Sequence, residues 1–214
     1  MKKIICFVLA LSLILCSACT KAPEEELYNY EVVTEPFESM KSYCMAPDYR
    51  GYSYEQQIFD ESEMVFIGMP LEAFAEGEQR FFDINANELE SGNAPYEYTV
   101  RNVKVIEMIK GDSSVSVVPV ADESIVKESE DGEMVIAGER PANQIAKKNA
   151  KYVYYVSRAL PESIDFYFVP YDCPAVNIDG LDTRINKNNR FYDEIRDKFS
   201  EQFVKYDRSA ELVK

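Results

Sequence analysis

The chain has 214 residues, with 38 acidic side chains against 23 basic ones and a formal net charge of -15 at pH 7. Binding to nucleic acid depends on clustered lysine and arginine, so this balance argues against a nucleic-acid partner. Histidine is absent, which excludes serine–histidine–aspartate and cysteine–histidine nucleophilic schemes and the usual histidine-based zinc sites.

The N-terminal segment has the layout of a secretory signal peptide. Two lysines form a basic start, an apolar run covers residues 4–16, and two small residues then precede Cys19. The apolar run is too short to span a bilayer comfortably. We therefore predict a signal peptide over residues 1–18. Residues 19–39, with their prolines and net negative charge, are predicted to be an extended acidic tether.

The end of this segment, Cys16-Ser17-Ala18-Cys19, resembles the lipobox of bacterial lipoproteins, with Cys16 standing where leucine is usual. The resemblance implies that Cys19 is lipidated with a diacylglycerol and becomes the new N-terminus. The acyl chains would then hold the protein at the extracytoplasmic face of the cell membrane. An ordinary cleaved signal without a lipid is the alternative.

Hydrophobic patterning predicts the following elements in chain order. We expect a short helix over 54–60, a buried strand over 63–69, an edge strand over 81–85, a long strand within 96–112, a strand over 115–120, an acidic loop over 122–132, a short apolar run over 134–137, a helical turn over 141–149, and strands over 152–156 and 165–171.

The long strand changes phase along its length. Tyr98 and Val100 alternate with polar neighbours, but the apolar positions then move to Val103 and Val105. One extra residue near Arg101 and Asn102 would turn both halves toward the same core. We therefore predict a β-bulge there.

The tail carries aromatic or aliphatic residues at four-residue steps, namely Phe191, Ile195, Phe199 and Phe203. This spacing predicts an amphipathic helix over 189–206. A membrane-surface helix would show an excess of basic residues, whereas the charges on the polar face balance here. We therefore expect the helix to dock on the strands.

These elements predict a mainly β fold, a small antiparallel OB-like barrel with a C-terminal amphipathic helix, as a single domain over residues 40–214. The segments 62–68, 103–112 and 150–156 resemble strands of secreted bacterial domains with an OB-like, tissue-inhibitor-of-metalloproteinase-like (netrin-module) barrel. That resemblance implies proteinase inhibition as one possible activity. The family's inhibitors use a free N-terminal cysteine, which acylation of Cys19 would block.

Two cysteines remain if Cys6 and Cys16 leave with the signal and Cys19 carries the lipid. An even remainder in an exported chain predicts a disulfide between Cys44 and Cys173. It would stabilise the fold by about 5 kcal/mol in the chain-entropy model, as an upper value. Two unpaired, buried thiols are the alternative.

No pattern indicates a catalytic, metal or cofactor site, and no phosphate-binding glycine loop is present. A carboxylate pair such as Asp83 with Glu97 is the alternative that a hydrolase would need. Residues 177–182 and 128–133 group oxygen ligands but lack the EF-hand spacing for calcium, so we interpret both as solvent-facing acidic turns.

The chain has 15 tyrosines and no tryptophan. Tyrosine suits recognition of peptides and sugars, and Tyr43, Tyr49, Tyr52 and Tyr54 form the best candidate for a ligand-binding surface. Partial burial against the barrel is the alternative for these rings. We therefore expect a lipid-anchored binding or interaction module for a protein, peptide or glycan, not an enzyme. An extracellular carboxylate-dependent hydrolase is the alternative.

Overall fold

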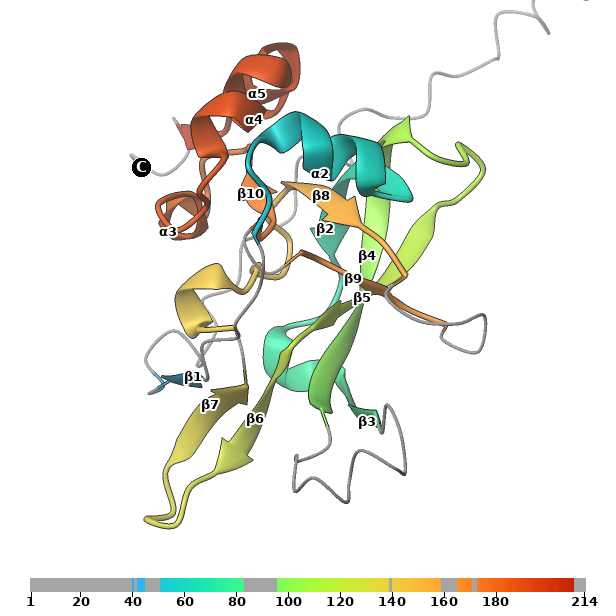
Figure 1. Cartoon of the computed structure of the whole chain (residues 1–214). Helices are drawn as coiled ribbons and strands as arrows, with labels where there is room; N and C mark the ends of the chain where they lie inside the picture. The colour runs from blue at the N-terminus through green and yellow to red at the C-terminus, as the bar shows by residue number, and fades with distance from the viewer. Residues whose placement is uncertain are drawn as a thin grey trace, which may run out of the picture. The chain divides into compact units, whose positions relative to one another are not determined.

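A computed structural model of the chain describes residues 40, 42–44, 51–82, 96–138, 140–158, 165–170 and 173–209. The predicted signal peptide and tether, as well as Tyr49 and Asp83, lie outside the described residues. The strands are β1 Ser42–Cys44, β2 Met64–Pro70, β3 Glu78–Phe82, β4 Tyr96–Lys110, β5 Val117–Asp122, β6 Ser124–Glu128, β7 Met134–Gly138, β8 Tyr152–Val156, β9 Tyr167–Phe168 and β10 Val176–Asn177. The helices are α2 Glu55–Glu61, α3 Thr183–Asn186, α4 Tyr192–Lys198 and α5 Ser200–Tyr206, with 3-10 turns η3 Phe74–Glu76 and η5 Ala142–Gln144 (Figure 1).

The larger sheet curls into an OB-like barrel. Its strand order is β10-β8-β2-β4-β5-β9, and β3 pairs with the first half of β4. All its strand pairs are antiparallel except β5 with β9. A bridge between Ser157, directly after β8, and Phe168 of β9 joins the two sides of the curled sheet, with N–H···O distances of 3.1 and 2.9 Å. This arrangement confirms the predicted mainly β, OB-like fold.

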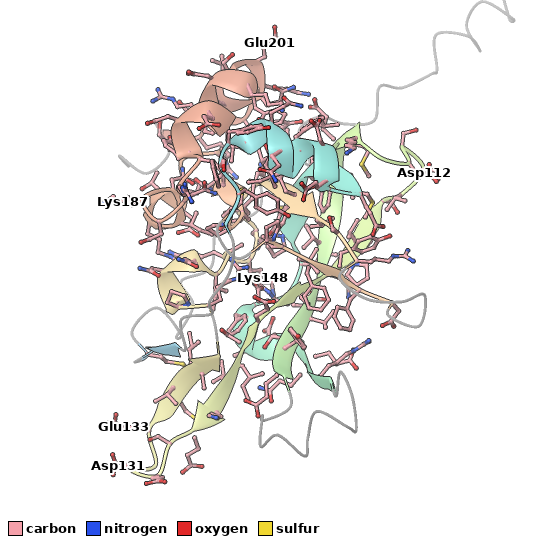
Figure 2. All side chains as sticks on the ribbon, viewed as in Figure 1. Asp112, Asp131, Glu133, Lys148, Lys187 and Glu201 are labelled. Atoms are coloured by element: carbon pink, nitrogen blue, oxygen red, sulfur yellow. The ribbon has the colours of Figure 1, made fainter. Side chains whose placement is uncertain are left out.

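A second, smaller sheet has the order β1-β7-β6. The predicted acidic loop over 122–132 is wrong in its first half, because residues 124–128 form β6 and pair with β7 in an antiparallel hairpin. Ile125 is buried and Val126 half-buried, so this short stretch gains enough apolar contact to form a strand. The acidic residues gather instead at the hairpin turn, where Figure 2 shows Asp131 and Glu133 pointing outward.

The predicted bulge near Arg101 and Asn102 is wrong. The pairing of β4 with β5 runs without interruption from Thr99 opposite Asp122 to Lys104 opposite Val117. Register shifts occur farther along β4, where it pairs with β2. The apolar phase changes because the two faces of β4 contribute to different clusters, and Arg101 points into the barrel.

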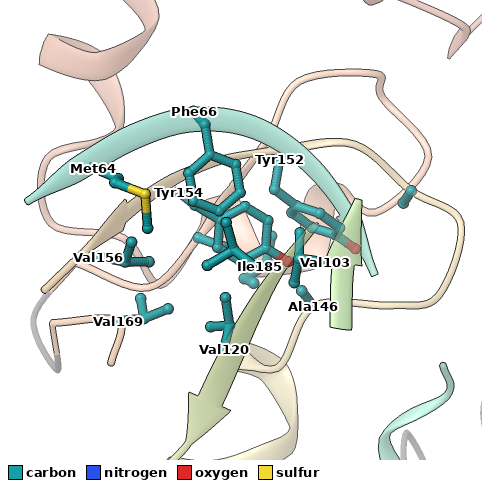
Figure 3. Close-up of a cluster of buried hydrophobic side chains, with 13 residues drawn as sticks. Met64, Phe66, Val103, Val120, Ala146, Tyr152, Tyr154, Val156, Val169 and Ile185 are labelled. Carbon is teal, nitrogen blue, oxygen red and sulfur yellow. The ribbon is translucent and has the colours of Figure 1, made fainter. Parts of the chain in front are cut away.

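The barrel core forms around aromatic rings of neighbouring strands. The rings of Phe66 on β2 and Tyr154 on β8 stack with centroids 5.3 Å apart, and Tyr152 lies beside Tyr154 (Figure 3). Val103 of β4 and Ile185 of α3 complete this part of the cluster. On the other face of β4, a second buried cluster consists of Tyr98, Val100, Ala121, Phe166 and Phe168.

The C-terminal segment is helical and docks on the strands, but it forms two helices rather than one. They meet at Phe199, whose backbone leaves helical geometry at φ -108° and ψ 29°. Phe191, Ile195 and Phe199 are buried, as the four-residue spacing predicts, and Phe203 is half-buried. The ring of Phe199 packs edge-on against Tyr155 of β8 at 6.4 Å, which places the tail on the barrel.

Candidate functional site

Three charged side chains are buried together where β4, β5 and the segment after β7 meet. Arg101 Nη2 donates to Asp122 Oδ2 at 2.8 Å, and Arg140 Nε lies 3.8 Å from Asp122 Oδ1. The side chains of Arg101, Asp122 and Arg140 are 3%, 9% and 1% exposed. Such a group is stable only when each charge finds partners, because water does not solvate it. We call these three residues the charge network.

Backbone carbonyls add further hydrogen bonds to the charge network, although Nε and Nη1 of Arg140 have no hydrogen-bond acceptor among the described residues. Arg101 Nη1 donates to the carbonyl of Ala146 at 2.8 Å, and Arg140 Nη2 donates to that of Val169 at 3.0 Å. The guanidinium of Arg101 also lies 5.4 Å above the ring of Phe74. These contacts tie β4, β5, residues 140–146 and the segment around Val169 together, and Arg101 also contacts η3 through Phe74.

Two buried tyrosines point into the same interior. Tyr152 Oη donates to Asp182 Oδ2 at 2.7 Å and accepts from the backbone N–H of Lys147 at 2.7 Å. Arg184 Nε lies 2.9 Å from Asp182 Oδ1. Burial raises the pKa of both Tyr152 and Tyr154 well above the usual tyrosine value. Both hydroxyls are therefore harder to ionise than that of an exposed tyrosine.

Glu55 joins α2 to the barrel and to the tail. Its Oε1 accepts from Tyr155 Oη at 2.5 Å, and both carboxylate oxygens lie 2.9 Å from Lys198 Nζ. Burial, together with the hydrogen bond to Glu55, raises the pKa of Tyr155 above its usual value. This carboxylate thus holds α2, β8 and α4 in one arrangement.

The segment 177–182 is a buried turn, so the prediction that it faces solvent is wrong. Asp179 accepts from Asn177 Nδ2 at 2.7 Å and from the backbone N–H of Lys151 at 2.8 Å. Burial raises the pKa of Asp179, and these hydrogen bonds oppose the rise. The carboxylates of Asp179 and Asp182 satisfy backbone and side-chain donors instead of pointing outward. Residues 130–133, by contrast, are exposed as predicted.

The four tyrosines of the predicted binding surface lie in different settings. Tyr43 belongs to β1 and pairs with Ala137, whereas Tyr54 directly precedes α2 and is 54% exposed. Tyr52 is half-buried, and Tyr49 lies outside the described residues. Figure 1 shows β1 and α2 at separate places in the fold. Tyr52 and Tyr54 are therefore the part of the surface that the structure describes, and ligand binding there stays a prediction.

The structure describes one side chain of each of the two remaining predicted pairs, the disulfide and the carboxylate pair. Cys173 is buried, with Asn189 Nδ2 3.7 Å from its sulfur, whereas the side chain of Cys44 is outside the described residues. Their disulfide stays a prediction. Glu97 lies 3.8 Å from Lys127, and its proposed catalytic companion Asp83 is not described. The carboxylate pair of a hydrolase therefore stays a prediction as well.

Sequence reasoning missed the charge network and Glu55. The one available signal was Arg101, a charged residue inside an otherwise strand-forming run. Strand periodicity treats polar residues as solvent-facing and therefore predicts a bulge there instead. Asp122 fell in the predicted loop, and nothing in the local sequence indicates that these two residues meet.

Within the described ranges, no group of three or more cysteine, aspartate or glutamate side chains is arranged to hold a metal ion. None of the helices in that part of the chain has the length and hydropathy of a membrane-crossing segment. Comparison of the chain with protein-family models, curated proteins and solved structures finds no match.

Proposed function

We propose that the protein is a lipid-anchored lipoprotein of the extracytoplasmic membrane face, and that its OB-like barrel is a binding or interaction module rather than an enzyme. The role as a binding module rather than an enzyme is supported mainly by the buried carboxylates, which accept hydrogen bonds within the fold. Among the described residues, Glu55, Asp122, Asp179 and Asp182 are buried, and each accepts hydrogen bonds that join separate segments.

A carboxylate that acts as a general acid or base must reach a substrate proton directly or through one water. The buried carboxylates instead face arginine, lysine, tyrosine or backbone N–H groups of the same chain, and all four are less than a tenth exposed. This use of the acids supports a structural role. OB-like barrels commonly present an exposed strand face and adjoining loops to their ligands. The acidity of this chain favours a protein, peptide or glycan over an oligonucleotide.

Membrane attachment is tested with Cys19→Ala in cells that express the full chain. We expect the wild type to fractionate with membranes and to incorporate a labelled fatty acid, and the variant to lose both properties. Cys6→Ala is the matched control, because it removes a cysteine of the predicted signal peptide that lies outside the lipobox-like motif. Retention of Cys19→Ala in the membrane fraction with its label intact would show that the anchor lies elsewhere.

The binding role is tested by cross-linking on intact cells, followed by mass spectrometry. We expect the wild type to capture a defined partner, and Tyr52→Ala/Tyr54→Ala to capture less of it. Val204→Ala, which shortens an exposed apolar side chain on α5, is the control and should capture as much as the wild type. Absence of any partner, combined with turnover of a substrate at a defined rate, would favour the hydrolase instead.

A further inference from the structure

Two stretches of this acid-rich chain contain no carboxylate residue. Residues 140–151 and 183–192 together contain seven lysines and arginines and no aspartate or glutamate. These two stretches hold η5 and α3, which contact each other. We call six of their accessible polar side chains the basic face: Asn143, Lys147, Arg184, Lys187, Asn188 and Arg190.

Hydrogen bonds hold the two stretches side by side. Arg184 Nη1 donates to the carbonyl of Ala142 at 2.5 Å, and its Nη2 donates to that of Ile145 at 2.6 Å. Asn188 Nδ2 lies 3.4 Å from the carbonyl of Asn143. The basic face is thus built on a fixed junction between segments about forty residues apart, and Figure 2 shows Lys187 at its outer side.

The nearby carboxylates pair with cations other than Lys187 and Arg190. Glu76 lies 3.2 Å from Lys148 of the first stretch. Asp182 is buried and already contacts Arg184 and Tyr152. Lys187 and Arg190 are exposed, and within the described ranges neither has a carboxylate partner. Elsewhere, Lys205 pairs with Glu107 at 3.0 Å and Lys198 with Glu55 at 2.9 Å. Exposed cations that remain unpaired on such an acidic molecule are available to an acid from outside.

We propose that the basic face binds an acidic peptide segment of a partner protein. This inference rests on the proposed binding function and names its partner class. Arginine and lysine would pair with the carboxylates of the segment. The amide of Asn143 offers donors and an acceptor. Asn188 offers its amide oxygen, because its Nδ2 already donates to the carbonyls of Asn143 and Arg184. This mixture suits a peptide backbone with its N–H and C=O groups. A phosphate polymer presents acceptors almost exclusively and would leave the amide oxygens unused.

A membrane surface fits this face less well. The exposed large hydrophobic residues, Tyr54, Leu71, Val117, Met134 and Val204, all lie outside the two stretches, so the face offers none of them for insertion. The net charge of -15 also opposes approach to anionic lipid. A short acidic peptide reaches the local cations without bringing the rest of the protein against a charged surface.

The test uses the full lipidated chain in neutral detergent and a fluorescent hexaglutamate peptide, with anisotropy as the measurement. We expect saturable binding that weakens between about 50 and about 300 mM salt, and no binding of hexaglutamine. Lys187→Glu/Arg190→Glu should weaken binding by about tenfold or more, because two attractive contacts become repulsive. The control Lys127→Glu/Arg196→Glu makes the same change in charge at exposed positions on β6 and α4 and should bind nearly as the wild type.

Circular dichroism of both double variants verifies that they are folded. Absence of hexaglutamate binding by the wild type, or equal weakening in both double variants, would overturn the inference. So would equal or tighter binding of polyphosphate, or of neutral vesicles doped with anionic lipid, through the same two residues. If cross-linking on cells captures a partner that Lys187→Glu/Arg190→Glu retains in full, the binding function stands and this assignment fails. If the wild type captures none, the binding function itself fails.

Discussion

Asp122→Asn would remove the negative charge that lies between two buried guanidiniums while leaving the size of the side chain almost unchanged. Asp122 Oδ2 accepts from Arg101 Nη2 at 2.8 Å, and its Oδ1 lies 3.8 Å from Arg140 Nε. Because both arginine side chains are at most 3% exposed, water cannot replace the lost charge. Removing one partner of a buried ion pair typically costs about 3–5 kcal/mol. We expect a loss of this size in the free energy of unfolding.

Urea denaturation followed by circular dichroism and tyrosine fluorescence measures this loss, since the chain has no tryptophan. Lys127→Met is the control. It removes an ion pair to Glu97 at 3.8 Å whose side chains are 51% and 30% exposed. Pairs of this kind contribute about 0–1 kcal/mol. The two variants should therefore differ by at least about 2 kcal/mol.

A triple replacement separates the loss of charge balance from the loss of packing. Arg101→Met/Asp122→Leu/Arg140→Met removes all three charges and fills the space with apolar side chains. It should recover at least half of the stability that Asp122→Asn loses, because no buried charge is left uncompensated. If Asp122→Asn costs no more than Lys127→Met, the argument that the charge network supports the barrel is refuted.

Two further perturbations test the packing of β2 and the attachment of the tail. Gly68→Ala should lower the free energy of unfolding by about 1–3 kcal/mol, because the added Cβ would lie 2.5 Å from Val103 Cγ1; an unchanged urea midpoint would contradict this. Burial raises the pKa of Glu107, but hydrogen bonds from three side chains of α5 outweigh it, and the net pKa is lowered. Ionised Glu107 therefore stabilises the fold above the usual glutamate pKa of about 4.3, and this contribution is lost as pH falls through the lower folded-state value. Between about pH 6 and about pH 3, the free energy of unfolding should fall less steeply in Glu107→Gln than in the wild type. Equal slopes in the two proteins would contradict a stabilising contact between Glu107 and α5.

Much of the barrel could be predicted because its strands carry continuous or alternating apolar residues. The run in β2 and the tyrosine- and valine-rich run in β8 are both buried along their whole length. Such runs form strands in almost any compact fold, since no other conformation of so few residues buries both faces between neighbours. Strand β6 was missed because its apolar contribution is only two residues long and lies among charges.

The interior polar residues could not be predicted in the same way. Arg101 lies on the strand face that sequence patterning assigns to solvent, yet it points toward the core. It can do so because its guanidinium donates to Asp122 on the next strand and to the carbonyl of Ala146, 45 residues away in the chain. The basic face likewise depends on the contact between α3 and η5, which neither stretch encodes alone.

Apolar periodicity was enough to identify most of the barrel strands and the docked tail, because it sets which side of each element avoids water. Which charges lie inside, and which cations remain unpaired outside, depends on tertiary contacts. The guanidiniums of Arg101 and Arg140 can be buried because Asp122 of another segment lies beside them. Whether a surface cation is paired likewise depends on which distant residues the fold brings next to it.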